Sequence, residues 1–151
     1  MDQAFLYLVL WALIFAVIFA ILIKKGWTLG GGVSKKGKRE RLDTGFVRNK
    51  WQEIQTLMNQ GRPSAHKVAV MDADKLLDYV LKTKLGTNGT MKDRLIKSRN
   101  LYANYQTYKD VGFAHGYRNR VAHDERLELF PAEVKKVISY FERALRDLKA
   151  L

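Results

Sequence analysis

The chain has 151 residues, which leaves room for one membrane span and one small domain rather than for two globular domains. It contains no cysteine, so disulfides, thiolate metal sites and cysteine nucleophiles are excluded. The formal net charge is +12, of which residues 46–151 carry +8, with twenty Lys and Arg against twelve Asp and Glu. A domain this basic favours a polyanionic partner, most often nucleic acid.

Residues 4–23 are the first predicted element, a run of twenty residues without a charge. A helix of that length spans roughly 30 Å, the thickness of a bilayer's hydrocarbon core. The alternative is a buried core helix, but the length of the run and its apolar character on every face argue against it. A cleaved signal peptide would carry positive charge before the run, whereas Asp2 is the only charge there and Lys24 and Lys25 follow it. We therefore expect an uncleaved transmembrane helix.

A basic linker, residues 24–45, follows the span and contains three consecutive glycines from Gly30. No Lys or Arg precedes the span, so the positive-inside rule places residues 1–3 outside the cell membrane and the C-terminal domain in the cytoplasm. The same basic residues can bind anionic lipid headgroups, or they can act as a topology signal alone. They are Lys24, Lys25, Lys35, Lys36, Lys38, Arg39 and Arg41.

The remainder, residues 46–151, is predicted to be all-α. A first helix has Thr44 as a possible N-cap and ends at Gly61-Arg62-Pro63; its apolar residues are Val47, Trp51, Ile54 and Met58. Pro63 suits the first turn of the second helix, whose apolar stripe is Ala69, Ala73, Leu76, Leu77 and Val80. The sequence Leu-Gly-Thr-Asn-Gly at residues 85–89 predicts a loop.

Three further helices complete the predicted domain. Thr90 and Asp93 form a near capping box, which opens a helix with Leu95 and Ile96 facing inward. A fourth helix is expected over residues 102–122. Pro131 opens a fifth, with one apolar face made of Val134, Val137, Ile138, Phe141, Leu145 and Leu148. No segment alternates as a strand does, so we expect a small antiparallel bundle of four to five helices.

The residues that suggest chemistry lie at the end of the fourth helix. His115, Asn119 and His123 recur at i, i+4 and i+8 and so line one side, which Arg118 flanks. His115 and His123 are roughly 12 Å apart along a helix, too far to share one metal ion, and no phosphate-binding glycine loop is present. An imidazole can take the proton of a ribose 2′-hydroxyl, and a guanidinium can hold the phosphate. Such a group suits RNA cleavage without a metal or other cofactor.

The stretch from Arg118 to His123 resembles the R-x4-6-H motif of the HEPN superfamily (higher eukaryote and prokaryote nucleotide-binding domains), in which Asn often follows the Arg. The resemblance covers residues 46–151 and includes the acidic, then apolar, residues 70–81. It implies an all-helical domain that usually dimerises and cleaves RNA, with Arg118, Asn119 and His123 as catalytic residues. It implies Asp72 as a candidate supporting residue; His115 matches no position of the family and is kept as a second candidate.

The sequence therefore predicts a membrane-anchored, metal-independent endoribonuclease of HEPN type, a homodimer that acts as toxins of that superfamily do. The identity of a partner protein that restrains it is left open. The alternative is a non-catalytic dimerisation or RNA-binding module that tethers a partner to the membrane. A purely structural membrane protein is a third option. In the non-catalytic interpretations His123 caps helix carbonyls and Arg118 pairs with an acidic residue of the last helix. Four tyrosines are either base-stacking or core residues: Tyr102, Tyr105, Tyr108 and Tyr117.

Overall fold

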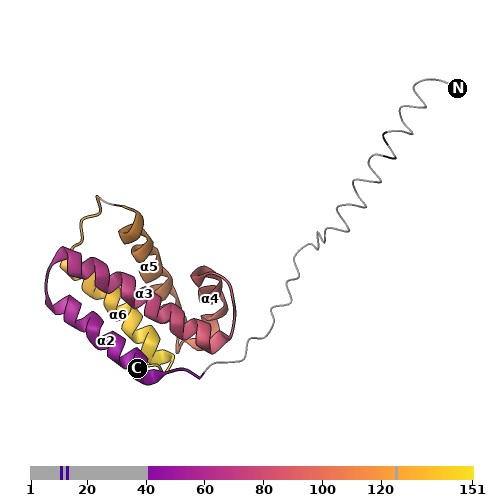
Figure 1. Cartoon of the computed structure of the whole chain (residues 1–151), viewed down its shortest axis with the longest axis horizontal. Helices are drawn as coiled ribbons and strands as arrows, with labels where there is room; N and C mark the ends of the chain where they lie inside the picture. Colours follow the sequence, from indigo (N-terminus) through magenta and orange to yellow (C-terminus); the bar gives the residue numbers. More distant parts are fainter. Residues whose placement is uncertain (1–10, 12, 14–40, 125) are drawn as a thin grey trace. The chain divides into compact units, whose positions relative to one another are not determined.

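The computed structural model describes residues 11, 13, 41–124 and 126–151. The helices of residues 41–151 form one compact unit, in which the described residues contain no strand (Figure 1). The prediction of an all-α bundle is thus confirmed for this part of the chain. Its elements are α2 (Thr44–Asn59), α3 (Pro63–Leu85), α4 (Met91–Lys97), the short 3-10 turn η1 (Arg99–Leu101), α5 (Tyr105–His123) and α6 (Pro131–Asp147).

The predicted transmembrane segment, residues 4–23, lies outside the described residues apart from Trp11 and Leu13. The same is true of the predicted basic cluster, of which Arg41 alone is described. Within the described residues, none of the helices combines the length and the apolar character that crossing a bilayer requires.

Helix α3 is the centre of the bundle, because α2, α4, α5 and α6 all pack against it. Only residues 60–62 connect α2 to α3, so these two helices form an antiparallel hairpin (Figure 1). Gly61 adopts a positive φ of 68° in this turn, which a residue with a side chain rarely does. Pro63 then occupies the first turn of α3, as predicted. Helix α6 packs against both α3 and α5 and closes the core.

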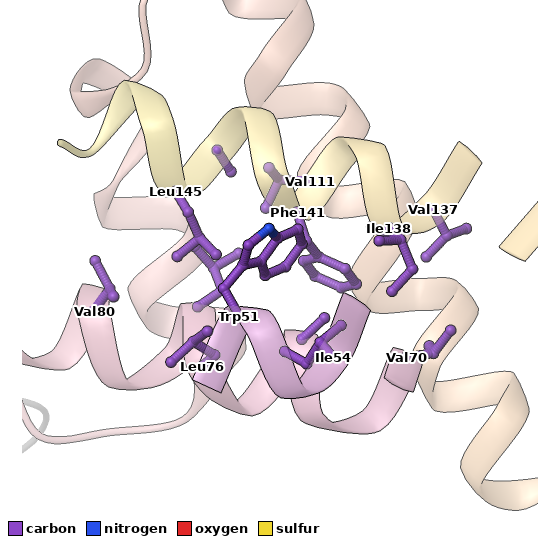
Figure 2. Close-up of a cluster of buried hydrophobic side chains, with 14 of the residues drawn as sticks. Trp51, Ile54, Val70, Leu76, Val80, Val111, Val137, Ile138, Phe141 and Leu145 are labelled. Atoms are coloured by element: carbon purple, nitrogen blue, oxygen red, sulfur yellow. The ribbon is translucent and has the colours of Figure 1, made fainter. Parts of the chain in front are cut away.

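The core contains every residue of the apolar stripes predicted for α3 and α6. Figure 2 shows Trp51 and Ile54 of α2 in the same cluster as Ile138, Phe141 and Leu145 of α6. Full burial of one such aliphatic or aromatic side chain stabilises a fold by roughly 1.5–3 kcal/mol. This cluster therefore holds α2, α3 and α6 together and fixes which side of each helix faces outward.

Two helix starts differ from the predicted ones because an asparagine or aspartate nearby makes the cap. Asp43, rather than Thr44, is the N-cap of α2, since its Oδ1 accepts a hydrogen bond from the backbone N–H of Phe46 at 2.9 Å. Helix α5 begins at Tyr105, three residues later than predicted, because Asn104 caps it by accepting from Thr107 N–H at 2.8 Å. The prediction for Thr44 was wrong by one position.

The capping box of α4 is confirmed, and it lowers the pKa of Asp93, whose carboxylate accepts hydrogen bonds from the backbone and hydroxyl of Thr90. Leu95 is buried as predicted, but Ile96 is 59% exposed, so its predicted inward position was wrong. Arg94 takes the inward position instead. Its guanidinium donates to both carboxylate oxygens of Asp78 on α3, at 2.7 and 2.8 Å. A buried ion pair thus docks α4, where an apolar contact was expected.

Candidate functional site

The candidate site lies where the second half of α5 meets α3. One side of α5 is fixed in the core by Ala114, Tyr117 and Val121, which recur at helical spacing and are buried. His115 and Arg118 follow directly after two of these residues, so they stand at the edge of the core beside α3. Asp74 of α3 is only 4% exposed and meets them there.

Four side chains form a closed network: Asp74, His115, Arg118 and Asn119. Asp74 Oδ1 lies 2.8 Å from His115 Nδ1, and Asp74 Oδ2 lies 3.5 Å from Arg118 Nε. Arg118 Nη1 donates to Asn119 Oδ1 at 3.1 Å. Asn119 Nδ2 lies 3.3 Å from His115 Nε2, which completes the ring. The structure thus brings together three of the predicted site residues, His115, Arg118 and Asn119, around a carboxylate that was not predicted.

Arg118 is held in the network by charge more than by hydrogen bonds to Asp74. Its Nε is buried and has no hydrogen-bond acceptor among the described residues, although the ion pair to Asp74 spans 3.5 Å. A buried donor without an acceptor costs roughly 1–3 kcal/mol. About a quarter (24%) of the Arg118 side chain is exposed, so part of the guanidinium remains open to a ligand. A buried polar group left unsatisfied in a folded protein calls for an explanation, and a role in binding a ligand is one.

His123 is exposed at the last position of α5, and no hydrogen bond or ion pair joins it to the described residues. It lies five positions after Arg118, which corresponds to about 140° around an α-helix. The two side chains therefore leave α5 in clearly different directions. Both are accessible to solvent, but one chain does not direct them at a single point.

Asp72, the predicted supporting carboxylate, is not part of the network. It pairs with Lys75 at 3.2 Å and lines a pocket between α2 and α3 with Phe46 and Tyr79. The carboxylate of the network is instead that of Asp74, which the sequence analysis missed. A signal for it exists, because Asp74 stands at helical spacing within a buried stripe of α3 formed by Val70, Leu77 and Leu81. A carboxylate in such a stripe is expected to have a partner.

The predicted non-catalytic pairing of Arg118 with the last helix is wrong, because its acidic partner is Asp74 of α3. Arg120 is the arginine that approaches α6, at 3.8 Å from Glu133.

The four tyrosines divide between core and surface. Tyr102 and Tyr117 are buried, and burial raises the pKa of Tyr102 to about 12 and shifts that of Tyr117 in the same direction. Tyr105 is 55% exposed and stacks on Tyr108, with ring centroids 5.7 Å apart. Arg99 lies 5.0 Å above the ring of Tyr105. Of the four, Tyr105 presents the largest aromatic surface to solvent.

Within the described part of the chain, no three His, Asp or Glu side chains are grouped as a metal ion would require. No family model matches the sequence, and comparisons with the curated proteins and with solved structures find no match.

Proposed function

We propose that the chain is a membrane-anchored, metal-independent endoribonuclease of HEPN type. The observation that carries this proposal is the position of Arg118, which pairs with the buried carboxylate of Asp74 and donates a hydrogen bond to Asn119. The side chains of Arg118 and Asn119 are both partly open to solvent. A guanidinium fixed in this way can bind a phosphate with its remaining N–H groups. The exposed imidazole of His123 near the end of the same helix supplies the group that transfers protons.

The reaction uses the ribose 2′-hydroxyl as nucleophile. A base takes the hydroxyl proton, a bond forms between O2′ and phosphorus, and the bond from phosphorus to O5′ breaks as O5′ receives a proton. The products are a 2′,3′-cyclic phosphate and a 5′-hydroxyl. In this scheme Arg118 stabilises the charge on the phosphate oxygens, Asn119 holds Arg118, and His123 acts as general acid or base. DNA lacks the nucleophile and is spared.

A homodimer fits this scheme better than a monomer does. Because Arg118 and His123 diverge by about 140° around α5, one chain presents them to different sides. Two-fold pairing of the α5 ends would place Arg118 of one protomer beside the His123 of the partner subunit. Each of two equivalent clefts would then contain one guanidinium and one imidazole.

The membrane part of the proposal is supported by the sequence. Residues 4–23 would cross the cell membrane with the N-terminus outside, and the helical domain would lie in the cytoplasm. The basic linker would contact anionic lipid headgroups. An RNA-cleaving toxin in the cytoplasm would also need a restraining partner protein.

The test uses the full chain in detergent micelles, a single-stranded RNA and EDTA. Arg118→Ala and His123→Ala should each abolish cleavage while circular dichroism shows unchanged helicity. Arg120→Ala is the matched control, because Arg120 lies on the same helix but points to Glu133 of α6. It should cleave as the wild type does. Cleavage that persists in the Arg118 and His123 variants, or that stops in EDTA, rejects the mechanism.

A second candidate function is a non-catalytic RNA-binding module at the membrane. Two observations favour it: Arg118 and His123 do not converge within one chain, and Tyr105 presents an exposed ring with Arg99 and Lys109 close by. An aromatic ring among cations is a platform on which bases stack. This function predicts RNA that is bound but stays intact, and binding that Tyr105→Ala weakens more than Arg118→Ala does.

A further inference from the structure

The proposed reaction assigns no chemical step to two buried or half-buried groups of the site, Asp74 and His115. The carboxylate of Asp74 lies in the core, and 18% of the His115 side chain is exposed. Their 2.8 Å contact joins α3 to α5 directly beside Arg118. An ionisable pair in this position needs a reason, because an apolar pair of similar size would pack α3 against α5 at lower cost.

The donors and acceptors of the network can be ordered in only one way. A guanidinium only donates, so the atom of Asn119 that faces Arg118 is the acceptor Oδ1. Nδ2 of Asn119 therefore faces His115, and because an amide nitrogen only donates, His115 Nε2 must accept. The Asp74 carboxylate also only accepts, so the proton of His115 is on Nδ1. The network thus requires a neutral imidazole in its Nδ1–H form.

We propose that Asp74 and His115 are positioning residues for Arg118, and that they act through Asn119. This inference rests on the proposed function, in which Arg118 binds the RNA phosphate. Asp74 fixes the tautomer of His115, His115 fixes which way the Asn119 amide faces, and Asn119 fixes Nη1 of Arg118. Nη2 of Arg118 has no partner among the described residues and stays available for a phosphate oxygen.

A second proton on His115 would disrupt this order. It would sit on Nε2 and face the Nδ2 hydrogens of Asn119, so the amide would have to turn and would then present Nδ2 to Arg118. The charged groups that face His115 are Asp74 from α3 and Arg118 from α5 itself. The ion pairs between α6 and α5 lie elsewhere, on Arg120 and Asp110. With His115 neutral, the negative charge of Asp74 balances the positive charge of Arg118. A charged imidazole would add a second cation beside Arg118.

Asp74→Asn is the variant that separates this role from simple packing. The side chain keeps its size, and its carbonyl is expected to turn toward the Arg118 cation. The amide nitrogen would then face His115 Nδ1, which must become an acceptor and shift its proton to Nε2. The side-chain amide of Asn119 would then turn around, and Nη1 of Arg118 would lose its hydrogen bond to Asn119 Oδ1. Asp72→Asn is the matched control on the same helix, because Asp72 pairs with Lys75 and lies outside the network.

The experiment uses the full chain in detergent micelles with ¹⁵N-labelled histidine, which is practical because the chain has three histidines. Ring-nitrogen chemical shifts should show His115 protonated on Nδ1 in the wild type and in Asp72→Asn, and on Nε2 in Asp74→Asn. Affinity is measured for a 2′-O-methyl RNA that cannot be cleaved. Asp74→Asn should weaken binding by about tenfold, as Arg118→Ala should, and Asp72→Asn should leave it unchanged.

The outcomes separate this inference from the proposed function. An Nε2–H tautomer in the wild type overturns the inference without any variant. Weaker binding in Arg118→Ala together with unchanged binding in Asp74→Asn also overturns it, while the role of Arg118 stands. Unchanged binding in Arg118→Ala rejects the proposed function, and the positioning role with it.

Discussion

Replacing Asp78 by alanine removes the carboxylate against which Arg94 is buried. The Arg94 side chain is 7% exposed, and its guanidinium makes hydrogen bonds of 2.7 and 2.8 Å to Asp78 and one of 2.7 Å to the carbonyl of Gly89. In the variant only the bond to Gly89 remains, and a charged group stays buried between α3 and α4. The short helix α4 loses the contact that docks it.

The expected cost follows from this burial. Removing one partner of a buried ion pair destabilises a protein by about 3–5 kcal/mol. The Asp78 side chain is 31% exposed, so water can replace part of its contact with Arg94, and we expect about 3 kcal/mol. In a domain of this size 1 kcal/mol shifts Tm by roughly 4 °C, so Tm should fall by about 12 °C.

The assay is the unfolding of residues 41–151 by urea, for the free energy, and by heat, for Tm, both monitored by circular dichroism. Glu53→Ala is the control, because it removes an exposed ion pair, 2.7 Å from Lys50, and should cost less than about 0.5 kcal/mol. The double variant Asp78→Leu with Arg94→Met should return to within about 1 kcal/mol of the wild type, since it leaves no buried charge unpaired. A loss in Asp78→Ala no larger than that in Glu53→Ala would refute this reasoning.

Two further predictions concern stability. Gly112 and Gly116 lie inside α5, and a Cβ added at either would meet no atom of its surroundings within 4 Å. Each Gly→Ala change should therefore raise the free energy of unfolding by about 1 kcal/mol and raise Tm with it, and a fall in Tm would contradict this. Tyr102 keeps its proton in the folded state up to its raised pKa of about 12, whereas the unfolded chain loses it near 10. The unfolding free energy should be insensitive to this group below about pH 10 and fall between about pH 10 and 12, by at most about 3 kcal/mol. Tyr102→Phe should flatten that fall in urea titrations; an unchanged slope would exclude Tyr102 as its cause.

The sequence predicted the core well because helical spacing determines which residues share a face. The stripe from Val134 to Leu148 on α6 is buried throughout, as its period required. The same reasoning failed at Ile96, since the inward position of α4 belongs to Arg94. The partner that allows this, Asp78, is sixteen residues away in the sequence, and no local pattern links the two.

The residues of the candidate site on α5 were predicted, and the residue on α3 was not. His115 and Asn119 are four residues apart on one helix, so their contact follows from helical spacing alone. The carboxylate that contacts His115 and Arg118 belongs to Asp74, 41 positions before His115, whereas the sequence analysis had named Asp72. The buried stripe of α3 already favours Asp74, and the packing of α3 against α5 explains why, because Asp74 turns toward α5 and Asp72 toward α2.

Arg118 is proposed to act on a phosphate beside a free ribose 2′-hydroxyl, and that hydroxyl gives the most direct test. The full chain in EDTA is incubated with an RNA oligonucleotide and with the same oligonucleotide carrying one 2′-deoxyribose at the cleaved position. The RNA should be cut to a 2′,3′-cyclic phosphate end, and the substituted oligonucleotide should stay intact at that bond. Cleavage of both at the same bond, or RNA left intact by the wild-type chain, would contradict the proposed reaction.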